Sequence, residues 1–414
     1  MSSKQIFAAM EIADHEIRLI VGELHNLKFN VMKVERVEID GVEKQRISNE
    51  DNVISGIKKA IANASKMIGV PITRVLLIVP SLDMQRFSKR ITENLNKPKV
   101  VISDIQNAIK IAISTPIDGM LELVNYACIR YVVNGFTTRR IPINEKADSL
   151  AVDIDLLCAN KEMVWEYAKC VECAQLEIID IYLDTFALST EAALFERAIG
   201  HYVLLIRVEK DTTTLTLLAS GKIENSIVVN KGYGQFVEIV ASTYNLPIEV
   251  ANRLIRYNCR LKSNVLDSPI YLWSFENKSH TISEAQLVEM VRPLFIDWIT
   301  ELKAICQDIL EHDDVVGVLS GEGAEILELV DLMSESFKVN FEVYVPDTLG
   351  VRDSALATCM GAFYCYNDQE MFRSQTLYSM DTDVFTSVIN EVKIIDNKIE
   401  KEDTLTNRFK RLFK

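Results

Sequence analysis

Two stretches far apart in the chain share one pattern of apolar and polar positions. Residues 202–206 are apolar, 207–213 are polar, and 214–219 return to residues that favour β-strands. Near the N-terminus, IFAAMEI is followed by Ala13-Asp14-His15-Glu16 and then IRLIVGEL. Each pattern predicts a strand, a tight turn and a returning strand. Two hairpins of one design, about 190 residues apart, predict a chain built from two related halves.

The rest of the first half predicts a mixed α/β domain with an inserted α+β segment. The helix 49–69 has Asn49 or Asp51 as its N-cap and Gly69 as its stop signal. The insertion occupies 82–160. The pattern predicts strands at 29–39, 74–80, 87–94, 121–133, 136–143, 149–158 and 176–184, and helices at 103–114, 161–174 and 185–198.

The second half continues with helices and ends in a polar stretch. Gly232 and Gly234 open a helical run, Pro247 starts another, and 260–282 is polar and strand-like. A long helix is expected from Ser283 to Glu311, with a capping box formed by Ser283 and Gln286. A strand, a Gly-containing turn and a helix follow from 317, and then a strand at 339–346 and a helix at 354–366. Residues 367–403 are polar and acidic and are expected to be a tether.

Composition narrows the possible functions. The chain has 414 residues, enough for roughly two to four domains, and no apolar run of 18 residues. Its net charge of −14 argues against nucleic-acid binding. The N-terminus does not resemble an export signal. The cysteines, including Cys170 and Cys173 on a predicted helix, have no zinc-site partners, and the histidines are dispersed, so we expect no metal site and a reducing, cytoplasmic location.

The extreme C-terminus carries a separate signal. In the segment 404–414, TLTNRFKRLFK, the apolar residues fall on one face of a helix and the basic residues flank that face. This pattern is typical of a helix that lies in the headgroup region of an anionic phospholipid membrane. A basic tail that docks on the chain's own acidic surface is the alternative. The residues expected to bind the membrane are Leu405, Arg408, Phe409, Lys410, Arg411, Leu412, Phe413 and Lys414.

Three predicted turns follow one another along the chain. The first two, Ala13–Glu16 and Glu209–Thr212, are hairpin turns, and the third, Gly321–Ala324, lies between a strand and a helix. This order resembles the actin, Hsp70 and sugar-kinase superfamily. Within it, the chain is similar to the FtsA family of bacterial cell-division proteins over nearly its whole length. The segments that carry the resemblance are MEIADHEIRLIVGEL, VLLIVP, LLASGKI, KGYG, NLPIEVANRLIR, VRPLFIDWITELK and GVLSGEGAEI, together with the insertion at 82–160 and the C-terminal helix.

The resemblance implies an α/β actin-like fold in two lobes. The first lobe would carry the insertion that distinguishes this family, called subdomain 1C, and the second would divide into 2A-like and 2B-like parts. The implied boundaries are 1–81, 161–198 and 350–366 for lobe 1, 82–160 for 1C, 199–232 and 312–349 for 2A, 233–311 for 2B, 367–403 for an acidic linker and 404–414 for the membrane helix.

The phosphate-binding turns depart from the family pattern. The first turn has two carboxylates where the family has small residues and a lysine, and the second has Arg207, Glu209, Lys210 and Asp211 in place of an aspartate and glycines. A phosphate about 4 Å from an unpaired carboxylate is repelled by roughly 1 to 4 kcal/mol. We therefore expect weak binding of ATP and Mg and no significant hydrolysis. By resemblance, the nucleotide-binding residues would be Glu11, Thr212, Gly232, Arg256, Gly321, Gly323 and Ala324.

The alternative for these turns is a structural one, in which their charges pair across the cleft, for example Lys210 with Asp14 or Glu16. In either case no residue is expected to be catalytic.

The function implied by the resemblance is to anchor FtsZ filaments to the cytoplasmic face of the membrane at the division septum. The chain would also self-assemble as an actin-like polymer and recruit later division proteins. The FtsZ C-terminal peptide would bind the 2B-like part, where Arg292 and Lys303 are candidate contacts. Two alternatives stay open: an actin-like scaffold of a pilus or secretion platform, and a small-molecule kinase of the same superfold.

Overall fold

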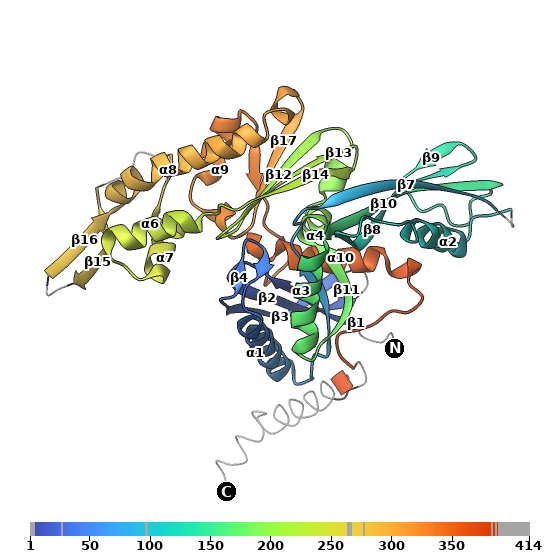
Figure 1. Cartoon of the computed structure of the whole chain (residues 1–414), viewed down its shortest axis with the longest axis horizontal. Coiled ribbons are helices and arrows are strands. Elements are labelled where there is room, and N and C mark those ends of the chain that lie inside the picture. The colour runs from blue at the N-terminus through green and yellow to red at the C-terminus, as the bar shows by residue number, and fades with distance from the viewer. Residues whose placement is uncertain are drawn as a thin grey trace, which may run out of the picture.

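Two five-stranded sheets with the same topology form the two lobes of the computed structural model (Figure 1). Residues 5–25, 28–95, 98–262, 267–275, 278–381, 384–385 and 387 are described. In each sheet three consecutive antiparallel strands are followed by two parallel ones. Lobe 1 has the order β11-β6-β1-β2-β3 and lobe 2 the order β14-β13-β12-β17-β18. The two related halves predicted from the hairpins are therefore present.

The strand bounds follow the predicted pattern closely in lobe 1 and less closely in lobe 2. The predicted strand 339–346 is only three residues long. Lobe 1 contains β1 (Gln5–Ile12), β2 (Glu16–His25), β3 (Lys28–Glu38), β6 (Arg74–Val79) and β11 (Glu177–Leu183), with a small hairpin of β4 (Val42–Glu43) and β5 (Arg46–Ile47). Lobe 2 contains β12 (Tyr202–Val208), β13 (Thr213–Ala219), β14 (Lys222–Val229), β17 (Val315–Ser320) and β18 (Phe341–Val343).

Helices of lobe 1 cover its sheet. Asn49 caps α1 (Glu50–Ile68) by accepting a hydrogen bond from the Asn52 N–H, and left-handed Gly69 ends the helix, as predicted. The helix expected at 185–198 is divided in two, because Ala193 has a φ of 50° and interrupts the helical hydrogen bonds. The other helices are α3 (Lys161–Cys173), α4 (Asp184–Glu191), α5 (Leu194–Arg197) and α10 (Ala357–Asp368), which follows a 3₁₀ turn, η3 (Ser354–Leu356).

Lobe 2 packs α9 (Leu329–Phe337) against its own sheet and carries α6 (Gly234–Tyr244), α7 (Ile248–Asn258) and α8 (Glu284–Ile305) on an extension (Figure 1). The capping box at Ser283 and Gln286 is present, but α8 ends at Cys306, so the predicted helix to Glu311 is too long; a 3₁₀ turn, η1 (Ile309–Glu311), occupies the remainder. The polar region before it forms the hairpin β15 (Pro269–Phe275) and β16 (Lys278–Ser283). A further 3₁₀ turn is η2 (Glu322–Glu325).

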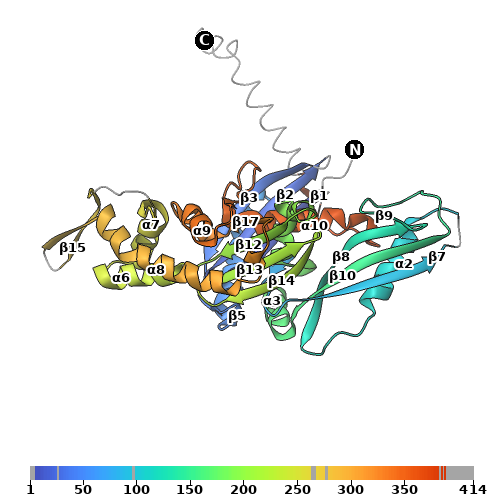
Figure 2. The same cartoon turned by 90° about the horizontal axis from the view of Figure 1, so that it is seen from above.

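The inserted segment builds its own sheet around its own small core. Its order is β7-β10-β8-β9, and α2 (Ile102–Ile113) packs against it. It lies at the opposite end of the molecule from α6, α7 and the β15–β16 hairpin (Figures 1 and 2). It contacts lobe 2 through an ion pair between Arg86 and Glu224 at 2.6 Å. Its strands are β7 (Gln85–Asn94), β8 (Leu121–Val133), β9 (Phe136–Thr138) and β10 (Ser149–Asn160).

The expectation that 367–403 is a tether is wrong for its first part. Gln369 is buried and its amide donates to Asn125 Oδ1 at 2.8 Å. After η4 (Glu370–Phe372), Ser379 donates its N–H to the Ile6 carbonyl at 3.0 Å and accepts from the Thr73 N–H at 2.9 Å. Asn125 belongs to β8 of the inserted segment, whereas the bonds of Ser379 satisfy backbone groups of lobe 1. Residues 367–381 therefore pack on lobe 1 and on the inserted segment. Residues 388–414, including the predicted membrane helix, lie outside the described residues.

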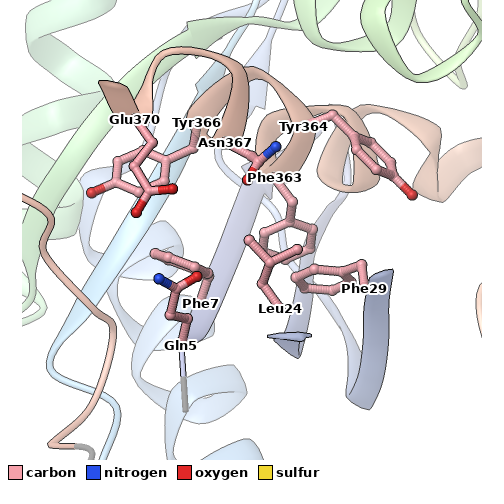
Figure 3. A pocket seen from close by; sticks show the side chains of 9 residues that line it. All are labelled: Gln5, Phe7, Leu24, Phe29, Phe363, Tyr364, Tyr366, Asn367 and Glu370. Atoms are coloured by element: carbon pink, nitrogen blue, oxygen red, sulfur yellow. The ribbon is translucent and has the colours of Figure 1, made fainter. Parts of the chain in front are cut away.

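Aromatic side chains of α10 pack against the sheet of lobe 1 at β1 and β3. Phe29 and Phe363 stack with ring centroids 3.9 Å apart, and Phe7 packs against Tyr366 at 5.0 Å. Figure 3 shows the narrow cavity between them. Its volume of about 20 Å³ is enough for about one water molecule. We interpret it as a packing gap and not as a ligand site.

The close approach of α10 to α4 gives a test of this packing. A Cβ atom added at Gly361 would lie 1.8 Å from the Ala187 carbonyl oxygen, so one helix would have to move. We expect Gly361→Ala to lower the free energy of unfolding by roughly 1–3 kcal/mol in chemical denaturation. Gly200→Ala is the control, because nothing lies within 4 Å of the added atom there. Equal effects of the two substitutions would contradict the packing.

Candidate functional site: the seam between the lobes

The two hairpin turns meet where the lobes face each other. The Ala13 N–H donates to the Glu16 carbonyl at 2.9 Å, and the Glu209 N–H donates to the Thr212 carbonyl at the same distance. The turns are thus built alike. The Asp14 carboxylate accepts hydrogen bonds from the Asp211 N–H at 3.1 Å and the Thr212 hydroxyl at 3.0 Å, which joins one turn directly to the other.

Behind the turns, each lobe places one arginine on the carboxylates of the other. Arg18 of β2 is fully buried and binds Glu209 of lobe 2 through two contacts, at 2.7 and 3.1 Å. Arg207 of β12 binds Glu11 of lobe 1 and also Asp184 at 2.7 Å. Such paired geometry is the strongest form of ion pairing in a protein interior. The lobes are therefore joined by reciprocal, buried, charged hydrogen bonds.

A second layer of charges lies on the outer side of this pair. Glu16 accepts from Arg18 at 2.6 Å and from Arg36 at 2.6 Å. Glu322, from the third turn, accepts from Arg256 at 2.6 Å, and its second oxygen lies 3.0 Å from His15 Nε2. We define the interlobe network as the group Glu11, Asp14, His15, Glu16, Arg18, Arg36, Asp184, Arg207, Glu209, Arg256 and Glu322.

The arginines control the ionisation of the carboxylates. Burial alone would raise the pKa of Glu209, but the charges of Arg18 and Arg207 lower that pKa to about 2. Burial is likewise outweighed at Glu16 by Arg18 and Arg36, and at Glu322 by His15, Arg18 and Arg256, and both pKa values fall to about 2. Asp14 has no such partner, so burial and the nearby Glu209 and Asp211 raise its pKa to about 6.

The glycines of the turns let the second and third turns of lobe 2 pack closely on each other. A Cβ atom at Gly232 would lie 2.2 Å from the Glu209 carbonyl oxygen, and one at Gly321, where φ is 91°, would lie 2.5 Å from the Val208 carbonyl oxygen. The third turn and the start of α6 therefore press against the second hairpin turn. In the nucleotide-binding pattern glycine lets the backbone approach phosphate, whereas here it lets backbone approach backbone.

The structure brings together every residue that the resemblance assigned to the nucleotide. Glu11 and Arg256 take part in ion pairs, and Thr212 binds Asp14. Gly232, Gly321, Gly323 and Ala324 line the contact between the turns. Charge pairing across the cleft was the right alternative, but its proposed cation was wrong. Asp14 and Glu16 bond Thr212, Arg18 and Arg36 in place of Lys210.

Sequence reasoning missed Arg18 and Arg36. A signal for Arg18 existed, since it is the one charge in the apolar run IRLIV and stands opposite Glu11 in the β1–β2 register. A charge within a buried strand requires a partner. The two candidate FtsZ contacts are engaged within the chain, because Arg292 donates to the Leu261 carbonyl and Lys303 donates to the Ser336 carbonyl at 2.6 Å.

The seam does not fit a nucleotide phosphate. The space between the turns, lined by Asp14, Arg207, Glu209 and Thr212, amounts to about 10 Å³, at most a single water molecule. A phosphate placed there would meet Asp14 and Glu209, and it would have to displace Arg207 from Glu11. A wider cleft of about 950 Å³ adjoins the network. It is lined by mixed charges that include the network residues His15, Glu16, Arg36, Arg256 and Glu322 together with Lys59, Lys210 and Glu249.

A metal ion fits the seam no better. His15, Glu16 and Glu322 hold potential ligand atoms within 4.8 Å of one another. Both carboxylates are already bonded to arginines, and a cation would have to compete with Arg18, Arg36 and Arg256 at close range. The dispersed histidines of the sequence did not reveal this group.

The duplicated sheets and the three turns between them define an actin-like protein. Among solved structures, the chain is similar to a PilM–PilN type IV pilus biogenesis complex, with a TM-score of 0.58, 15% identity, and coverage of 86% of this chain and 98% of that one. It is also similar to MreB5 of Spiroplasma citri bound to ADP, with a TM-score of 0.51, 12% identity, and coverage of 89% and 97%. These likenesses confirm the predicted actin-like fold.

Sequence comparison narrows the class. No family model matches the chain. It is 22% identical to the cell division protein FtsA of Bacillus subtilis over 379 residues, covering 89% of this chain and 85% of that protein. It is 22% identical to FtsA of Enterococcus hirae over 411 residues, covering 96% and 92%. The chain is a divergent relative of FtsA, as the sequence motifs predicted, which supports an actin-like protein of cell division.

Removing one arginine of the network should unfold the seam. Arg207→Ala would leave Asp184 buried without its cation and Glu11 with Arg18 alone. We expect the free energy of unfolding to fall by roughly 3–5 kcal/mol. Arg197→Ala removes a more exposed ion pair with Glu342 and should cost less than about 1 kcal/mol. Urea titrations of both variants measure the difference. Similar losses would show that the interlobe network contributes little.

Asp14 should make stability depend on pH. Its folded pKa of about 6 lies above the ordinary aspartate value of 3.8, so the folded state holds its proton more tightly and stability falls as pH rises from about 4 to 6. Asp14→Asn removes this loss, and because one pKa unit equals about 1.4 kcal/mol, we expect a gain of roughly 1–3 kcal/mol at pH 7.5. The gain should shrink toward pH 4. Thermal unfolding at both pH values checks it, and a pH-independent gain would contradict the prediction.

Proposed function

We propose that this protein tethers FtsZ filaments to the cytoplasmic face of the membrane at the division site and assembles there as an actin-like polymer. The observation that carries the proposal is the similarity to FtsA across 85–92% of the relatives' length. The C-terminal amphipathic segment supports a peripheral mode of attachment. Across the described residues, no helix combines the length and the apolar character needed to cross a bilayer.

The proposed role is positional. Arg18 and Arg207 take the place in which relatives of this superfold hold the charge of a nucleotide, and they join the lobes with the chain's own side chains. A fixed interlobe network suits a protein that presents surfaces to partners without a nucleotide cycle. We therefore propose that assembly and tethering proceed without Mg-ATP and that later division proteins bind the assembled polymer.

The FtsZ tail is proposed to bind the 2B-like part of lobe 2. Because Arg292 and Lys303 bond carbonyls of this chain, other residues must make the contact. The exposed side of α8 carries Ile296 and Ile305 beside Asp297 and Glu301. This side offers apolar contacts more than positive charge to a peptide.

Flotation with liposomes and FtsZ tests the tether. The full chain should carry FtsZ to anionic vesicles, equally with and without Mg-ATP, and a chain that ends at Asp403 should not. Phe409→Glu breaks the apolar stripe and should weaken membrane binding about tenfold, because burial of a Phe side chain is worth about 1.5–3 kcal/mol. Asn407→Glu adds the same charge on the polar side and is the matched control.

The possible outcomes of the flotation experiment distinguish the candidate functions. Equal flotation of the truncated chain would remove the C-terminal segment as the anchor. A chain that floats but leaves FtsZ behind would favour the scaffold of a pilus or secretion platform. A requirement for Mg-ATP would contradict the proposal that the interlobe network replaces the nucleotide.

A further inference from the structure

A groove of about 680 Å³ runs along α3, where lobe 1 meets the inserted sheet. Half-buried apolar side chains form its floor, and glutamates form its rim. Trp165 projects into it with 62% of its surface exposed, and its indole N–H donates to Glu122 at 2.9 Å, which orients the ring. The floor is formed by Leu123, Val124, Val164, Ala168 and Ile181, and the rim by Glu50, Glu122, Glu162, Glu166 and Glu172.

The charge of the groove is strongly acidic. Lys169 is the cation among its lining residues, and it is paired with Glu50 at 2.7 Å. Arg46, at the edge, pairs with Glu166 at 2.5 Å and with Glu162 at 3.1 Å. Glu172 is exposed and has no ion pair among the described residues. An apolar floor with an exposed tryptophan and an acidic rim suits a basic amphipathic helix.

One segment of this chain has that chemistry. Residues 404–414 contain four basic residues and no acidic residue, and their apolar side chains form one stripe in a helix. Eleven helical residues extend over about 16 Å, and the thirteen residues of α3 over about 20 Å. The segment therefore matches the groove in length, in charge and in the pattern of its apolar residues.

The described chain ends within reach of the groove. Ser379 accepts from the Thr73 N–H at 2.9 Å, and the Thr73 carbonyl accepts from the Glu177 N–H at 3.0 Å. Glu177 follows shortly after the end of α3 at Cys173. Residues 388–403, sixteen in all, span up to roughly 55 Å when extended, well over the length of α3.

We propose that this groove is a docking site for the chain's own C-terminal segment 404–414. Docking buries the apolar stripe on Trp165 and places the basic residues against the glutamate rim. The docking itself does not depend on the proposed function. Its consequence does: an anionic membrane competes with the groove for the same residues, so the free protein keeps its anchor covered until it meets such a membrane.

Photo-crosslinking in the full chain tests the docking directly. With benzoylphenylalanine in place of Phe409, dilute protein should give crosslinks within one chain to α3 or β8. Glu172→Lys should lower their yield about two- to fivefold, as for loss of a surface charge pair, and higher salt should lower it too. Glu238→Lys on α6, an exposed glutamate outside the groove, is the charge-matched control and should leave the yield unchanged.

Flotation on anionic vesicles tests the consequence. Glu172→Lys should raise the vesicle-bound fraction at limiting lipid at least about twofold over the Glu238→Lys control. Crosslinks in α3 without flotation of any variant would sustain the docking and refute the membrane anchor. Crosslinks that map elsewhere, that join two copies, or that do not respond to Glu172→Lys would overturn the docking proposal.

Discussion

The buried ion pairs between Arg18 and Glu209 and between Arg207 and Glu11 are the interaction on which the relation of the lobes depends. Taking these charges out of water is costly, and only close, multiply bonded geometry offsets that cost. The hairpins supply this geometry because each presents an arginine from a strand in fixed register, with Glu11 on a strand of the first hairpin and Glu209 in the turn of the second. A small change in the angle between the lobes would break several bonds at once, which favours a single closed arrangement.

The duplicated topology explains why the network is reciprocal. In both halves the first hairpin turns on the side of the sheet that faces the other half, so the two turns point toward each other. Each half then contributes an arginine to the carboxylates of the other half. A nucleotide could bridge such turns only if they left room and carried little negative charge. Here glycines bring the backbones of the second and third turns of lobe 2 together, and side chains fill the space between the first and second turns. The same scaffold thus gains a permanent internal connection in place of a ligand site.

The seam holds the two lobes together, so the two ends of the molecule are free for contacts with partners. The inserted sheet has its own core, the helical extension shares the core of lobe 2, and both project away from the seam (Figure 2). The groove beside α3 lies where the inserted sheet joins lobe 1, close to the point where the described chain ends. An anchor segment attached at this place can reach both the groove and a nearby surface. The seam at the centre of the molecule therefore holds the lobes in place, and the surfaces that would bind partners lie toward its ends.

The sequence by itself determined the local elements: both hairpins, the caps at Asn49, Gly69 and Ser283, the inserted segment and the order of the turns that indicates the fold. These depend on neighbouring residues, so periodicity and capping residues predict them. Only the tertiary structure decided which charges pair, since Arg18 and Glu209 are separated by 191 positions and Lys210 was an equally plausible cation in the sequence. It also decided that residues 367–381 pack on lobe 1 and on the inserted segment, because their partners Ile6, Thr73 and Asn125 are distant in the chain and a polar composition gives no sign of them.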